Sequence, residues 1–197
     1  LHVVCRRQRQ MCIRDRGDFM LQMLRSFDTD LSWSTVTANR DLKVVRELLM
    51  HPMLLPGFND SGAHLTNMAF YDGNLRSLKL AHENNEDSDV AYMVKRLTKD
   101  AAEVFGVSGG SIYENDKADL ILVDPNELKK YDGEKHVARV FREEFNHEQL
   151  VNRSDNVVPL VIIGGHVAWE DEKFSKDLGQ EQFGELLKSK ISSNLND

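Results

Sequence analysis

The sequence of 197 residues predicts an α/β fold in which helices alternate with parallel strands, followed by a β-rich region. Three observations lead to this expectation. Apolar residues recur at helical spacing in several segments, short apolar runs separate those segments, and a run of branched residues follows Gly106. Up to residue 64 the order is helix, strand, helix, strand, loop, which implies a parallel sheet or barrel.

The first helix is expected over residues 18–27, where Phe19, Met23 and Phe27 share one face. Residues 31–36 alternate apolar and small polar side chains, which favours a strand. A second helix begins near Asn39. It should end before Pro52, because the residue that precedes a proline avoids helical geometry.

Residues 53–58 form a short apolar run that is typical of a buried parallel strand. The next four residues, 59–62, are Asn-Asp-Ser-Gly and have strong turn chemistry. Residues 82–89 are polar and acidic, which indicates a surface loop or the start of a helix. Asp60 therefore follows directly after a predicted strand.

An amphipathic pattern between Val90 and Phe105 predicts a helix, with Thr98 as a cap within it and Gly106 as its stop signal. Residues 118–124 predict a strand that Asp124-Pro125 terminates. A β-hairpin is expected over 157–169, around a turn at Gly164-Gly165. Two further local features are expected: Asn115 in the left-handed backbone region, and a charged terminal helix over residues 174–191.

Composition excludes several classes of protein. Apolar residues make up 41% and charged residues 29%, as in ordinary globular proteins, and no apolar window is long enough for a membrane span. Residues 1–16 carry five Arg and one Asp, a local charge of +4, so by subtraction from −7 the remainder carries −11. An acidic body argues against nucleic-acid or anionic-membrane partners. We expect a cytoplasmic protein.

Residues 1–16 differ in composition from the rest and resemble an adaptor-derived sequence, so we interpret them as a non-native leader; the alternative is a basic binding arm. Both cysteines, Cys5 and Cys12, lie in this segment. Disulfides and a cysteine-built zinc site are therefore not expected in the remainder.

Candidate chemistry is concentrated at Asp60. The sequence has no His-x-His, no His-Glu-x-x-His, no phosphate-binding loop and no Gly-x-Ser-x-Gly, so it contains no complete set of ligands for a familiar metal site. Catalytic groups of a barrel lie at the carboxyl ends of its strands, where Asp60 is expected. A carboxylate there can move a proton between a metal-bound water and a leaving amine. The alternative is that residues 59–62 form only a turn.

Four segments carry a resemblance to a known family: residues 53–76, 97–106, 110–124 and 157–165. In this order and spacing they resemble the N-acyl-D-amino-acid deacylase group of the amidohydrolase superfamily. The sequence departs from the family pattern in having Ala101 where a proline is usual and Asn115 where a glycine is usual.

The resemblance implies an α/β fold made of the C-terminal part of a (β/α)8 metal-dependent hydrolase barrel, followed by strands of a small β-sandwich domain. The expected organisation is a leader (1–16), the last barrel strands and helices (17–106), a β-rich return to the small domain (107–172) and a C-terminal helix or tail (173–197).

It also implies roles for individual residues. Asp60 would be the catalytic acid/base and, in some relatives, a metal ligand, while Ser61, His64, Asn67 and Arg76 would contact the substrate. For His64 a structural role in the loop is an alternative, and for Arg76 a solvated position on a helix face. The implied cofactor is zinc, whose other ligands would lie upstream of this chain, and the implied partner is a small-molecule N-acyl amino acid.

The expected activity is therefore hydrolysis of a carbon–nitrogen bond other than a peptide bond, namely deacylation of an N-acyl-D-amino acid. Two alternatives are a cyclic amide hydrolase, like a dihydroorotase or hydantoinase, and a non-catalytic scaffold with an amidohydrolase-like barrel. Because two strands of eight cannot close a barrel, we expect these 197 residues alone to hold no zinc and to be inactive.

Overall fold

A computed structural model describes residues 16–31, 38–57, 66, 71–83, 86–152 and 156–190. The chain divides into two compact units, Leu1–Arg40 and Asp41–Asp197. In the first unit, α2 (Arg16–Phe27) confirms the predicted helix and is followed by the 3-10 turn η1 (Asp28–Asp30). The apolar side chains of α2 are largely exposed, with Leu21 at 53%. Residues 32–36 of the predicted strand and the leader up to residue 15 lie outside the described residues.

The second unit begins with α3 (Leu42–Met50), whose first turn is capped by Asp41. The Asp41 carboxylate accepts hydrogen bonds from the backbone amides of Lys43 and Val44, at 3.0 and 3.4 Å. These bonds satisfy amides that the helix itself cannot pair. The helix ends at Met50, so the predicted stop before Pro52 is confirmed.

The strand predicted at 53–58 is not found in its described part, residues 53–57, which form a turn followed by irregular chain. An apolar run becomes a strand only where a neighbouring strand pairs with its backbone. Here the backbone carbonyl of Leu54 instead accepts a hydrogen bond from the guanidinium of Arg96.

Helices α4 (Gly73–His82) and α5 (Asp87–Lys95) follow, and α5 continues through the π-helical turn η3 (Arg96–Asp100) into α6 (Ala101–Phe105). Gly106 ends the helix with φ 63°, as predicted. Thr98 is not a cap. Its hydroxyl donates to the carbonyl of Val94 at 2.8 Å, inside the continuous helix.

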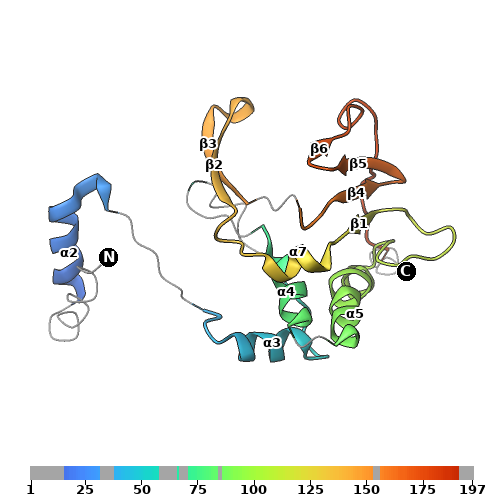
Figure 1. The fold of residues 1–197 in the computed structure, drawn as a ribbon, viewed down its shortest axis with the longest axis horizontal. Helices are drawn as coiled ribbons and strands as arrows, with labels where there is room; N and C mark the ends of the chain where they lie inside the picture. Colours follow the sequence, from blue (N-terminus) through green and yellow to red (C-terminus); the bar gives the residue numbers. More distant parts are fainter. Residues whose placement is uncertain are drawn as a thin grey trace, which may run out of the picture. The chain divides into compact units, whose positions relative to one another are not determined.

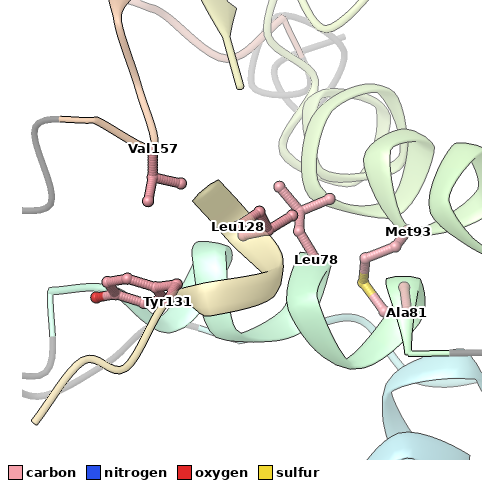
Figure 2. Packing of buried hydrophobic residues seen from close by; sticks show 6 residues of the cluster. All are labelled: Leu78, Ala81, Met93, Leu128, Tyr131 and Val157. Atoms are coloured by element: carbon pink, nitrogen blue, oxygen red, sulfur yellow. The ribbon is translucent and has the colours of Figure 1, made fainter. Parts of the chain in front are cut away.

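A small core joins α3, α4 and α5 to α7 (Pro125–Lys130). Within it, α4 packs against both α5 and α7 (Figure 1). The buried members of the core are Leu78, Ala81, Met93, Leu128, Tyr131 and Val157 (Figure 2). The side chain of Met93 is 1% exposed, and its burial stabilises the folded state by roughly 1.5–3 kcal/mol. The core contains residues from both sides of the predicted boundary at 106/107, and that division stays a prediction.

The larger sheet has the order β1-β4-β5-β6 and consists of antiparallel pairs. Its strands are β1 (Leu120–Leu122), β4 (Leu160–Ile163), β5 (His166–Glu170) and β6 (Lys173–Phe174). Both predicted elements are confirmed: the strand within 118–124 and the hairpin around Gly164-Gly165. These two glycines have φ of 56° and 84°, as the two-residue turn requires.

A second, two-stranded sheet pairs β2 (Val137–Arg142) with β3 (His147–Asn152), joined by the 3-10 turn η4 (Glu143–Phe145). This hairpin and the helices α4 and α7 were not predicted. The described fold is thus of mixed α/β class, and the strand pairs among the described residues are antiparallel. None of the helices in the described part of the chain has the length and apolar character that a membrane crossing requires.

The helix predicted over 174–191 is wrong for its described part. After β6, residues 175–190 form turns, an isolated bridge between Leu178 and Glu181, and irregular chain. Leu186 and Leu187 are 79% and 49% exposed, so no apolar face is buried that could stabilise a helix here. Asn115, by contrast, has φ 69° and occupies the predicted left-handed region.

Candidate functional site

Four of the predicted site residues, Asp60, Ser61, His64 and Asn67, lie outside the described residues. Arg76 is described and lies in the first half of α4. The described chain on either side of the predicted loop ends at Gly57 and resumes at Tyr71, apart from Thr66. The site can therefore be built from the residues that flank this segment.

Arg76 forms an ion pair with Asp72, one helical turn earlier. Its Nε donates to Asp72 Oδ2 at 2.7 Å, and the two side chains are 44% and 4% exposed. Burial lowers the pKa of the guanidinium, but the hydrogen bond and the charge of Asp72 outweigh this and the pKa is raised. Arg76 thus stays charged, half exposed and oriented by a buried carboxylate.

Asp72 is held from a second side by Tyr131, which follows α7. The phenol hydroxyl donates to Asp72 Oδ2 at 2.6 Å and lies 3.2 Å from Asn152 Oδ1. Tyr131 is 3% exposed, and its hydroxyl points away from Leu78 and Met93 (Figure 2). Its pKa is raised, first by burial and then by the hydrogen bond and negative charge of Asp72. Tyr131 therefore keeps its proton and donates a hydrogen bond to the Asp72 side chain.

The backbone approaches this ion pair closely at Gly133. A Cβ at this position would lie 2.0 Å from Asp72 Oδ2 and 2.6 Å from Arg76 Nη2. The carbonyl of Gly133 accepts a hydrogen bond from Asn152 Nδ2 at 2.9 Å, and Lys79 Nζ donates to the carbonyl of Tyr131 at 2.5 Å. The ion pair thus connects α4 to the chain after α7 and to the end of β3.

This geometry has two consequences for the prediction that Arg76 binds a substrate carboxylate. The half-exposed guanidinium can be reached by a solute, and a fork of donors suits a carboxylate. Its Nε, however, is used by Asp72, whose negative charge offsets that of Arg76. The alternative, a solvated arginine on a helix face, agrees with the exposed part of the Arg76 side chain but not with its hydrogen bond to the buried Asp72. Substrate binding by Arg76 stays a prediction.

Arg96 is a buried charged residue that sequence reasoning missed. It is 2% exposed, and its guanidinium donates to the Leu54 carbonyl and, at 3.1 Å, to the Tyr92 hydroxyl. It also lies over the Tyr92 ring, 5.3 Å from the centroid. Its Nε is buried without a hydrogen-bond partner among the described residues. The available signal was spacing: Arg96 is three residues after Met93, on the face that the periodicity predicts to be buried.

Two cavities lie elsewhere in the second unit. One, of about 450 Å³, lies between α4, α5, β1 and α7; it has an apolar lining that includes Leu78 and Val94. His82 also lines it, and its Nε2 is buried without a hydrogen-bond partner within the described part of the chain. The other, of about 430 Å³, has an acidic lining: Asp124, Glu127, Asp171 and Glu172. Neither was predicted.

The described residues contain no group of three or more His, Cys, Asp or Glu side chains that could hold a metal ion. Asp60, the predicted metal ligand, is not among them. Zinc binding stays a prediction.

Comparison with curated proteins finds uncharacterized proteins from Mycobacterium bovis and from two strains of Mycobacterium tuberculosis, each 32% identical to this chain over 167 residues. The match covers 82% of this chain but 27% of each relative, so the chain spans about a quarter of the length of the curated relatives it matches. No family model matches the chain, and no solved structure matches it.

Proposed function

We propose that this chain is the C-terminal part of a metal-dependent amidohydrolase that removes the acyl group from N-acyl-D-amino acids. The proposal depends on one observation, the order and spacing of the four segments that resemble this family: 53–76, 97–106, 110–124 and 157–165. Two of them, 110–124 and 157–165, belong to one β-domain in the resemblance. Here they contain β1 and β4, which pair with each other, and this supports the proposal.

The length of the relatives also supports it. A barrel of eight strands with a small β-domain needs far more than 197 residues, and this chain covers 27% of each relative. The remaining length is sufficient for the other strands of a barrel and for the metal ligands that the resemblance implies. The proposed active enzyme is therefore the full-length gene product, and we expect the 197-residue chain alone to be inactive.

In this proposal Asp60 performs proton transfer. It takes the proton of the attacking water and delivers it to the leaving amine, so that the amino acid departs as a neutral amine. A zinc ion, when bound, supplies Lewis acidity that polarises the amide carbonyl and lowers the pKa of water. Ser61, His64, Asn67 and Arg76 would orient the N-acyl amino acid.

The test is an assay of the purified full-length gene product with N-acyl-D-amino acids, their L enantiomers and cyclic amides such as hydantoins. We expect turnover of the linear D substrates, and an Asp60→Asn variant with kcat/KM lowered by about 10²- to 10⁴-fold. Asp177→Asn is the matched control, because Asp177 is exposed and lies far along the chain from the predicted loop.

Each other result has a defined meaning. Turnover of only the cyclic substrates would replace the deacylase with a cyclic amide hydrolase of the same superfamily. Undiminished turnover by Asp60→Asn would remove the role of Asp60. No hydrolysis of any amide by the zinc-loaded protein would favour the scaffold.

A further inference from the structure

The cavity of about 450 Å³ between α4, α5, β1 and α7 has the character of a small-molecule site. Its wall is mostly apolar and combines side chains that are far apart in the sequence: Leu78, Val90, Val94, Leu97, Ile121, Val123, Pro125 and Leu128. Cavities that bind small molecules typically have volumes of about 300–1,000 Å³ and an apolar lining with a few polar groups. This cavity has both properties.

The polar side chains described in this wall are Asn74, His82, Asp87 and Thr98. The Thr98 hydroxyl already donates to the Val94 carbonyl at 2.8 Å, and Asn74 and Asp87 are exposed to solvent. His82 differs from them, because its Nε2 is buried and has no hydrogen-bond partner among the described residues. A nitrogen that has already lost water gains a hydrogen bond from a ligand without giving up one to water.

The imidazole and the charges of the wall together define the ligand. His82 is the last residue of α4 and is half-buried, so its ring can turn to bring Nε2 to a molecule in the cavity. Nε2 accepts or donates a hydrogen bond according to the protonation of the ring, and a hydroxyl group suits both cases because it can do either.

Charge excludes the other common polar groups. No Lys or Arg lines the cavity among the described residues, so a carboxylate that entered it would lose its water without gaining a cation. Asp87 is exposed, and its solvated charge offers an ammonium group little stabilisation. The wall therefore favours a neutral ligand.

We propose that this cavity binds a neutral, mostly aliphatic molecule with one hydroxyl group, and that His82 is the side chain that recognises the hydroxyl. The aliphatic part lies against Leu78, Val94 and Leu128, and its burial supplies most of the affinity. Medium-chain alcohols are the simplest members of this ligand class.

The test uses the purified full-length gene product and three soluble probes with chains of equal length: 1-hexanol, hexanoate and hexylammonium. A methyl-resolved NMR titration gives the dissociation constants and also the place of binding. With 1-hexanol the methyl signals of Leu78, Val90 and Val94 should shift, while those of Val137 in β2 should not. The two charged probes should bind at least about tenfold more weakly, because each must lose its hydration.

Two variants separate the hydrogen bond from the apolar wall. His82→Phe removes the nitrogen and keeps an aromatic ring, so the affinity for 1-hexanol should fall about two- to tenfold, the range that one neutral hydrogen bond supplies. Val94→Trp fills the cavity from a wall position that is 44% exposed, so it should abolish binding without changing the buried core.

Matched controls make the same two changes at exposed positions outside the wall. His147 lies in β3, and Val104 lies in α6 and is 59% exposed. His147→Phe and Val104→Trp should bind 1-hexanol with the affinity of wild type.

Several results would overturn the proposal. Unshifted methyl signals of Leu78, Val90 and Val94 in wild type remove the site, and this measurement needs no variant to fold. Binding that survives Val94→Trp places the probe elsewhere. Equal affinities of wild type and His82→Phe remove the role of His82, and a charged probe that binds more tightly than 1-hexanol removes the neutral ligand class. No step measures hydrolysis, so these outcomes are separate from those of the proposed function.

Discussion

The hydroxyl of Tyr131 donates a hydrogen bond of 2.6 Å to Asp72 Oδ2, which connects the end of α7 to the N-terminus of α4 across 59 residues of sequence. Both side chains are almost fully buried, at 3% and 5% exposed. Because Asp72 Oδ2 also accepts from Arg76, this bond helps to fix the position of the Arg76 side chain.

Tyr131→Phe should lower the free energy of unfolding by about 1.5–3 kcal/mol, because it removes a buried donor to a charged acceptor and leaves the apolar ring in place. Urea unfolding followed by circular dichroism measures the change. Tyr113→Phe, at a 72% exposed position, should shift it by less than about 0.5 kcal/mol. Equal effects of the two substitutions would contradict the structural importance of this bond.

Stability should fall with rising pH in the alkaline range, in part because of Tyr131. Its pKa in the folded protein is raised above the ordinary 10.0 by burial and by Asp72. Below pH 10 both folded and unfolded states keep the proton, so the contribution is fully present. Above about pH 10 the unfolded chain loses the proton while the folded chain keeps it, so the free energy of unfolding decreases. Unfolding at pH 8 and pH 11 should show a smaller decrease for Tyr131→Phe than for wild type. A decrease of equal size would remove Tyr131 as a cause.

Gly133→Ala should destabilise the unit, because its new Cβ would lie 2.0 Å from Asp72 Oδ2. Overpacking of this kind costs about 1–3 kcal/mol, since the side chains of Asp72 and Arg76 must move to make space. Gly73→Ala is the matched control: nothing lies within 4 Å of a Cβ there. The control should be neutral or slightly stabilising in a thermal melt. A harmless Gly133→Ala would show that Asp72 and Arg76 are not held in this arrangement.

Gly164, in the β4–β5 hairpin turn, can be compared with Gly179, which lies after β6 and also has a positive φ. Gly164 and Gly179 both have positive φ, 56° and 83°, but only at Gly164 would a Cβ collide, 2.1 Å from the Phe183 carbonyl oxygen. Gly179→Ala should cost about 1–2 kcal/mol from backbone strain alone. Gly164→Ala should cost about 1–3 kcal/mol more, because the Phe183 backbone must shift. Equal losses of stability in a urea titration would mean that residues near Phe183 do not pack on this turn.

If the proposed function is correct, zinc content should differ between the 197-residue chain and the proposed full-length enzyme. Under the proposed function the other ligands lie upstream, so the purified 197-residue chain should hold much less than one zinc per molecule after dialysis. The full-length product should retain zinc, and a chelator should abolish its activity. Tightly held, stoichiometric zinc on the chain, measured by atomic emission, would contradict the proposed ligand set.

Elements that local chemistry specifies were predictable. The stop of α3 before Pro52, the left-handed Gly106 that ends α6 and the turn at Gly164-Gly165 each follow from the backbone preferences of one or two residues. A local signal could also have revealed α7, because Asp124 accepts from the amides of Asn126 and Glu127, with Pro125 in the first turn. Asp124-Pro125 thus marks both the end of the predicted strand and the start of α7.

Elements that need a partner were not predictable in the same way. Residues 53–57 are apolar enough for a strand, but their backbone meets the Arg96 side chain instead of another strand. In the β2–β3 hairpin, buried and exposed residues alternate only weakly, and Phe141 is 54% exposed. The sequences of its two strands therefore show little of the two-residue period that predicts a strand. In the described part of the segment expected as a helix, 174–191, Leu186 and Leu187 stay exposed and do not form a buried apolar face that could stabilise a helix.

The sequence by itself determined the mixed α/β class, the C-terminal ends of α3 and α6, the β4–β5 turn and the resemblance that motivates Asp60. These features follow from residues close together in the chain. Only the tertiary structure decided that Arg76 is paired with a buried Asp72, that Tyr131 completes this network and that Arg96 holds Leu54. The reason is physical: a charged residue reads as exposed in a sequence, and burial becomes favourable only when folding brings it a partner from tens of residues away.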